Sequence, residues 1–171
     1  MMTTVTFLGK PVELEGTLPA VGSQAPDFTL AASDLSEYKL SEHLGSVLVL
    51  SIVPSLDTDV CATSARTFNK KAADLKGVQV LNISEDLPFA AGRFCTVAEI
   101  KNVQALSDYR REGDFGKKYG VGICSGVLRG LLTRAVIVID KQGKVAYTQL
   151  LQEIATQPDY DAALAAAKAC L

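Results

Sequence analysis

Three short segments of the chain are almost continuously apolar. They cover residues 46–53, 78–84 and 135–140. Continuous rather than alternating apolarity is typical of a strand that is covered on both faces, as in the centre of an α/β sheet. The third segment is followed by a polar turn at 141–144 and a further apolar stretch at 145–147, which predicts an antiparallel hairpin.

The N-terminal residues show a different pattern, in which apolar and polar positions alternate. Val5 and Phe7 share one face, Val12 and Leu14 share another, and Gly9-Lys10 lies between the two runs. Alternation on both sides of a glycine-containing turn predicts a β-hairpin.

Four segments have helical features, and they cover residues 60–75, 88–100, 112–119 and 159–169. In the first, Phe68, Ala72 and Leu75 form a stripe at roughly helical period. The second begins with Asp86, which can cap a helix, and Pro88, which suits a first-turn position. Strands interleaved with helices predict an α/β fold with a central sheet and helices on both sides.

Composition and charge exclude several functional classes. The 171 residues fit one domain, 1–171, and the net charge of −2 lacks the basic surplus of nucleic-acid or anionic-membrane binding proteins. The single histidine excludes a multi-histidine metal centre within one chain. The N-terminus does not have the pattern of a signal peptide, and the longest apolar run, 47–53, is too short to span a bilayer. We therefore expect no membrane insertion and a cytoplasmic, reducing location.

The chain contains four cysteines, and no two of them form a CxxC pair. They are Cys61, Cys95, Cys124 and Cys170. Their scattered spacing fits neither a secreted disulfide framework nor a zinc ribbon.

The chemically informative segment follows the first central strand. The strand ends at Pro54, and Asp57, Thr58 or Asp59 can cap the helix whose first turn contains Cys61. Unpaired N–H groups and the positive end of the helix dipole there favour a nucleophilic thiolate over a thiol. Thr58 is three residues before Cys61, so its hydroxyl can approach the sulfur. A buried structural cysteine is the alternative interpretation.

These residues resemble a known family. The pattern Pro54-x-x-x-Thr58-x-x-Cys61 is similar to the active-site motif of the peroxiredoxins. The full run 54–61 looks like the bacterial thiol peroxidase subgroup, the atypical two-cysteine type. Further resemblance covers essentially the whole chain, at 22–30, 84–90, 93–95, 133–140 and 158–164. It implies a thioredoxin-like fold with a central mixed β-sheet flanked by helices and an N-terminal β-hairpin.

The resemblance also implies roles for individual residues. Cys61 would attack the peroxide and become a sulfenic acid, and Cys95 would condense with it to an intramolecular disulfide. Thr58 would hydrogen-bond the thiolate and the peroxide, Arg134 would stabilise charge from a neighbouring strand, and Pro54 would shield the sulfur from water. Taken alone, Arg134 also fits a surface arginine at a strand start, and Cys95, beside a phenylalanine, also fits core packing.

The remaining expectations concern partners and motion. The resemblance implies a thioredoxin-dependent peroxiredoxin that acts on hydroperoxides and forms a homodimer. No metal or organic cofactor is needed, because sulfur carries the electrons, and Cys124 and Cys170 are expected to be non-catalytic.

A disulfide needs Cα atoms about 4.4–6.8 Å apart. Cysteines in two separate intact helices usually lie farther apart, so we expect the helix at Cys61, the helix at Cys95, or both to unwind during turnover.

Two other functions remain open at this point. Cys61-Ala62-Thr63-Ser64 fits the C-x-x-S pattern of monothiol thioredoxin-like oxidoreductases, although Thr133-Arg134 stands where those proteins have a proline before the strand. A peroxide-sensing redox relay protein, whose disulfide alters partner binding, could use the same two cysteines.

Overall fold

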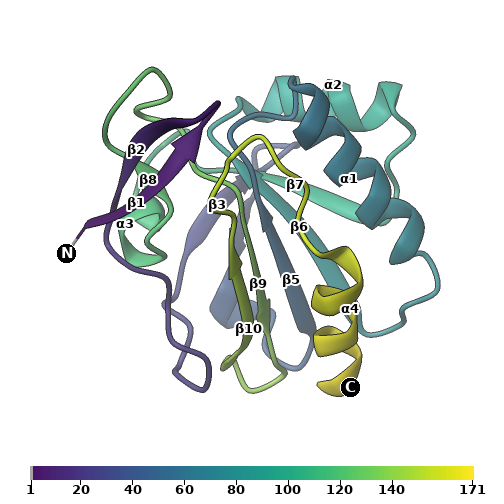
Figure 1. Ribbon diagram of the computed structural model, residues 1–171. Helices are drawn as coiled ribbons and strands as arrows, with labels where there is room; N and C mark the ends of the chain where they lie inside the picture. Colours follow the sequence, from purple (N-terminus) through teal and green to yellow (C-terminus); the bar gives the residue numbers. More distant parts are fainter. Residues whose placement is uncertain (1) are drawn as a thin grey trace.

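The computed structural model describes residues 2–171 and contains a large mixed sheet with helices packed against it (Figure 1). Along the sheet the strands follow the order β10 (Val145–Leu150), β9 (Ala135–Ile139), β5 (Val47–Ile52), β6 (Val78–Ser84), β7 (Val103–Ser107), β3 (Thr29–Ala32) and β4 (Glu37–Lys39). The expected α/β architecture with a central mixed sheet is confirmed.

The predicted central strands lie in the middle of this sheet. β5 runs parallel to β6 and antiparallel to β9, and every residue of β5 is buried. The predicted C-terminal hairpin is formed by β9 and β10. Strands β3, β4 and β7 have no counterpart among the strands that the apolar pattern singled out.

The helices differ in their ends from the predicted segments. They are α1 (Asp59–Lys71), α2 (Pro88–Val97), the single turn α3 (Phe115–Lys118) and α4 (Tyr160–Ala169). A short 3-10 turn, η1, spans Leu40–Glu42. Phe68 of α1 and Ala163 of α4 pack with Val49 of β5 on one face of the sheet. Phe115 of α3 packs on the other face, among side chains such as Leu50. The sheet is therefore flanked by helices on both sides, as expected.

The predicted N-terminal hairpin is present as β1 (Met2–Phe7) and β2 (Lys10–Glu15), extended by the short β8 (Gly122–Ile123). Two details of the prediction are wrong. The turn residues are Leu8 and Gly9, not Gly9 and Lys10. Val5 also pairs with Val12, so the apolar side chains of both strands share one face and form one small core with Leu14.

The order of the strands explains where a site can form. β5, β6 and β7 are parallel, so their carboxyl ends meet at one edge of the sheet. β9 is antiparallel to β5, with Ala135 opposite Ile52, so the start of β9 lies at the same edge. Residues that follow β5 and β6 are therefore brought close to residues that precede β9.

Candidate active site

Cys61 lies at this edge, as the third residue of α1. Its side chain is fully buried and it is present as a free thiol. The segment that precedes it leaves β5 at Ile52 and passes through Pro54, which is also buried. The first-turn position of Cys61 expected from the sequence is therefore confirmed, while the shielding role of Pro54 stays a prediction.

Arg134 is the charged partner of this cysteine. It lies one residue before β9 and is 3% exposed, so the alternative of a surface arginine is wrong. Its Nη2 donates to Cys61 Sγ at 3.0 Å, and its Nε donates to the carbonyl of Ile154 at 2.7 Å. Its Nη1 is buried and has no protein acceptor among residues 2–171. A fixed cation with one unpartnered nitrogen can both stabilise a thiolate and orient an oxygen of a substrate.

Thr58 occupies the N-cap position of α1, but its side chain makes no capping hydrogen bond. Its hydroxyl is exposed and donates to the carbonyl of Ser55 at 3.0 Å. No hydrogen bond from this hydroxyl to Cys61 is found within residues 2–171, so its expected contact with the sulfur stays a prediction.

Asp86 joins the loop that precedes Cys61 (residues 53–58, the cysteine loop) to the start of α2, a role that no sequence pattern predicts. Its carboxylate accepts from the Ser55 hydroxyl at 2.7 Å, the Leu56 N–H at 2.7 Å and the Ser84 hydroxyl at 3.0 Å. The expectation that Asp86 caps α2 is wrong, because Leu87 is the N-cap and the carboxylate is already occupied. Asp86 instead fixes the backbone that leads to Cys61.

Cys95 lies in α2, on the same side of the sheet as α1. It is half-buried, reduced, and packs against a small cluster that includes Ala65 of α1 and Ala105 of β7. Burial raises the pKa of its thiol above the ordinary value. Between the cysteine loop and α2 lies a pocket of about 420 Å³ whose lining includes Leu56, Asp57, Asp86, Arg93 and Phe94. The two cysteines therefore lie in two intact helices that share packing contacts.

The other two cysteines are separate from this pair. Cys124 is exposed and follows β8, and its thiol donates to the carbonyl of Glu13 at 3.3 Å. Cys170 follows α4, and its thiol donates to the carbonyl of Ala166 at 3.2 Å. Neither contacts Cys61 or Cys95 through a hydrogen bond.

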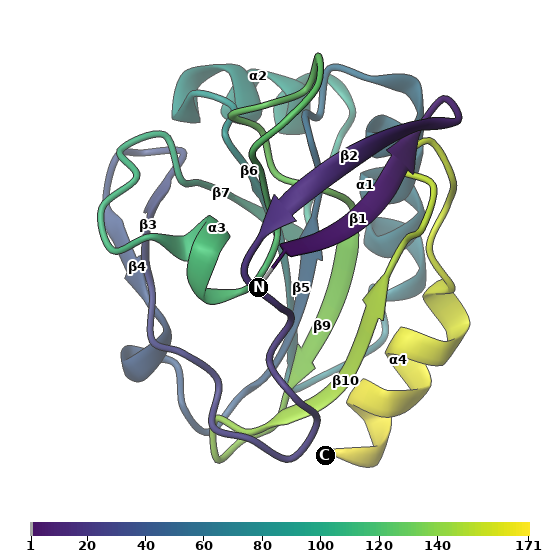
Figure 2. The same cartoon turned by 60° about the vertical axis from the view of Figure 1, so that its left-hand side comes forward.

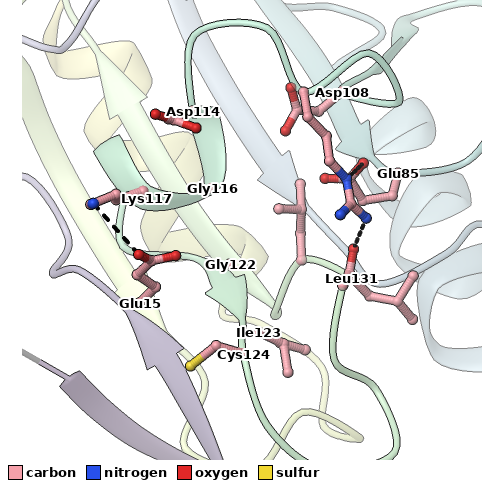
Figure 3. A pocket seen from close by; sticks show the side chains of 13 residues that line it. Glu15, Glu85, Asp108, Asp114, Gly116, Lys117, Gly122, Ile123, Cys124 and Leu131 are labelled. Atoms are coloured by element: carbon pink, nitrogen blue, oxygen red, sulfur yellow. Dashed lines mark hydrogen bonds and ion pairs between the residues drawn. The ribbon is translucent and has the colours of Figure 1, made fainter.

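A second charged cavity, of about 220 Å³, lies at the ends of β6 and β7 (Figure 3). Glu85 and Asp108 follow these strands and face each other, and Arg111 pairs with Glu85 at 3.5 Å. Across the cavity, Lys117 pairs with Glu15 at 3.6 Å. Burial, and then the charge of Asp108, raises the pKa of Glu85 to about 8, and burial raises the pKa of Asp108 to about 6.

This carboxyl pair makes stability depend on pH in a direction that can be tested. Both pKa values are raised on folding, so the stability they contribute is complete below about pH 4 and is lost as pH rises through 6 and 8. We expect E85Q to raise the Tm at pH 8.5 by about 2–4 °C, the shift that about 1 kcal/mol produces at this size. At pH 5 the difference should be small. Thermal unfolding at both pH values measures the difference in Tm, with the exposed E112Q variant as control. An E85Q variant whose Tm at pH 8.5 equals that of the wild-type protein contradicts the prediction.

The described residues were also searched for metal-ligand clusters and for membrane-spanning helices. Within residues 2–171, no three His, Cys, Asp or Glu side chains are grouped so that they could hold a metal ion. In the same range, no helix is both long and apolar enough to cross a membrane.

The fold and the site together define a thiol-dependent redox protein of thioredoxin-like architecture. Residues 20–164 match the family model described as Redoxin. The chain is 50% identical to the thiol peroxidase of Leptospira interrogans over 99% of its length and all of the relative. It is also 50% identical to the thiol peroxidase of Corynebacterium glutamicum over 96% of its length and 99% of that protein.

A solved structure gives the same result. A peroxiredoxin-like protein from Aquifex aeolicus superimposes with a TM-score of 0.93 at 44% identity and covers 99% of both chains. The chain therefore belongs to the redoxin family, and it is a peroxiredoxin-type oxidoreductase. The resemblance expected from the sequence is confirmed.

Proposed function

We propose that the chain reduces hydroperoxides through Cys61 and is recycled through Cys95. The observation that carries this proposal is the buried contact of 3.0 Å between Arg134 Nη2 and Cys61 Sγ. A guanidinium held against a sulfur in a water-poor site favours the thiolate, the form that attacks an O–O bond. The unpartnered Nη1 supplies a donor for the departing oxygen.

The proposed catalytic cycle has three steps. The Cys61 thiolate takes the outer oxygen of the hydroperoxide and, with one proton, gives a sulfenic acid and an alcohol, or water when the substrate is hydrogen peroxide. The Cys95 thiol then attacks the sulfenic sulfur, forms the disulfide and releases water. A dithiol reductant of the thioredoxin type finally exchanges with the disulfide and restores both thiols. Thr58 and Pro54 would orient the peroxide and exclude water.

We also propose that the chain forms a homodimer and is located in the cytoplasm. Leu87, Phe89 and Val97 are apolar and 54%, 67% and 77% exposed, which supports association through the α2 region. A catalytic disulfide is also compatible with a reducing compartment, because it is formed and reduced in each cycle. Molar mass in solution tests the dimer.

Peroxide consumption coupled to thioredoxin and its reductase tests the function of the wild-type protein. We expect sustained turnover with hydrogen peroxide or an organic hydroperoxide, and a sulfenic acid that dimedone traps on Cys61. Oxidation once per molecule without recycling would favour a redox sensor instead. Reduction of protein disulfides without peroxide consumption would favour a monothiol oxidoreductase.

A further inference from the structure

One peptide unit connects the active-site arginine to a carboxylate in the loop after β10. The Arg134 Nε donates to the carbonyl of Ile154 at 2.7 Å. At the other end of the same peptide unit, the Ala155 N–H donates to Glu153 Oε1 at 3.0 Å. Because a peptide unit is planar, a carboxylate that fixes its N–H also fixes the direction of its carbonyl.

Glu153 receives three more hydrogen bonds, all from the N-terminal hairpin. The Thr6 hydroxyl donates to its carboxylate at 2.7 Å, the Leu8 N–H at 3.0 Å and the Gly9 N–H at 3.1 Å. The donor from Ala155, followed by those from Thr6 and the hairpin, lowers the pKa of Glu153 to about 2. The side chain is therefore an anion at every physiological pH, and its hydrogen bonds are charge-assisted.

The hairpin turn has positive φ at both of its residues, which is usual for a two-residue hairpin but rarely accommodates a leucine. Leu8 has φ of 51°, in the left-handed region where a residue other than glycine is uncommon, and Gly9 follows with φ of 78°. Leu8 is also 71% exposed, so burial of its side chain does not explain the strain. Figure 2 shows this turn beside the segment that follows β10. The two consecutive N–H groups that point to Glu153 offset the strain.

The guanidinium of Arg134 has few other groups that could hold it. Its three nitrogens make one hydrogen bond to Cys61 and one to Ile154, and Nη1 has no protein acceptor in the described chain. The carbonyl of Ile154 is thus the only protein oxygen to which the guanidinium donates within residues 2–171. Any rotation of the 154–155 peptide would turn this acceptor away from Nε of Arg134.

We propose that Glu153 is a positioning residue for peroxide reduction, acting through the 154–155 peptide to hold Arg134 against Cys61. This inference rests on the proposed roles of Cys61 and Arg134. The negative charge at the N–H end of the peptide also polarises the unit, so the carbonyl becomes a better acceptor for the guanidinium. The N-terminal hairpin, far from Cys61 in sequence, thereby becomes part of the support of the active site.

The test is a double-mutant cycle on the rate constant for oxidation of Cys61 by hydrogen peroxide, measured in a single turnover. R134A should slow this step by about 10²–10³-fold, as the loss of a charge-stabilising donor does. E153Q keeps the size of the side chain but loses its charge, and should slow the step by about 10-fold through misplacement of Arg134. In the R134A background, E153Q should change the rate by less than about twofold, because the two residues act as a unit.

The control is E13Q, which removes an exposed carboxylate from the same hairpin and should leave the rate unchanged. Equal slowing by E153Q with and without Arg134 would overturn the inference and show a general effect on the fold. A normal rate in R134A would instead overturn the proposed active site. If E153Q does not fold, T6V removes one donor to the carboxylate and should slow oxidation in the presence of Arg134 but not in the R134A background.

Discussion

Peroxide turnover is expected to fall to the uncatalysed rate when Cys61 is replaced by serine. Serine has the shape of cysteine with a smaller oxygen in place of the sulfur, so the buried position and the neighbouring Arg134 should be retained. A serine hydroxyl does not ionise at neutral pH, however, and it cannot be oxidised to a sulfenic acid. Peroxide consumption coupled to thioredoxin and its reductase measures the loss, and circular dichroism checks that the variant is folded.

C124S and C170S are matched controls for this experiment. Each removes one sulfur outside the proposed pair, from a thiol that is hydrogen-bonded only to a backbone carbonyl. Both variants should keep the turnover of the wild-type protein. Full activity in C61S, or complete loss in either control, would refute the assignment of Cys61 as the attacking sulfur.

The features of the fold that could be predicted are those encoded by local pattern. The continuous apolar runs of β5, β6 and β9 identified central strands because both faces of these strands are buried. β3 and β4 have four and three residues, too few to show a clear period, and their place at one edge of the sheet depends on pairing with β7. Leu8 lies in the hairpin turn, where its N–H donates to the carboxylate of Glu153, a residue distant in sequence.

The candidate site divides in the same way. Cys61 could be placed in the first turn of a helix from the local signals of a strand end and capping residues. The burial of Arg134 could not be predicted from its neighbours in sequence, because it depends on packing between β9 and the loop around Ile154. The prediction that Asp86 caps a helix is wrong because its donors, Ser55 and Leu56, come from another segment of the chain.

The helix that carries Cys95 has the features of a segment that can open locally. Only Pro88 and Ala91 are buried within α2, and its N-cap residue makes no side-chain hydrogen bond. The Thr96 hydroxyl donates to the Gly92 carbonyl, a contact that slightly destabilises helices. Glu99, just after the helix, has φ of 54°. Few buried contacts and a strained end allow local opening at low free-energy cost.

The fate of Cys61 sulfenic acid should therefore depend entirely on Cys95. In C95S, one equivalent of peroxide should oxidise Cys61 at the wild-type rate, and the sulfenic acid should persist until dimedone traps it. Thioredoxin-linked turnover should fall by at least about 10²-fold, because no disulfide is available for exchange. Mass spectrometry of the trapped product and the coupled assay measure the two effects, with C124S as control. Sustained thioredoxin-linked turnover in C95S would contradict the role of Cys95.

The proposed cycle also predicts how disulfide formation in the wild-type protein depends on local unfolding and on pH. The sulfurs lie in two intact helices, so oxidised protein should show faster amide exchange than reduced protein at 88–98, at 57–66 or at both. Burial raises the pKa of Cys95 only while α2 is folded. The neutral thiol thus stabilises folded α2 below about pH 8.5, and this stability is lost as pH rises further. Disulfide formation, followed by stopped flow, should accelerate with pH above neutrality. Identical exchange in both redox states would show that the disulfide forms without unwinding.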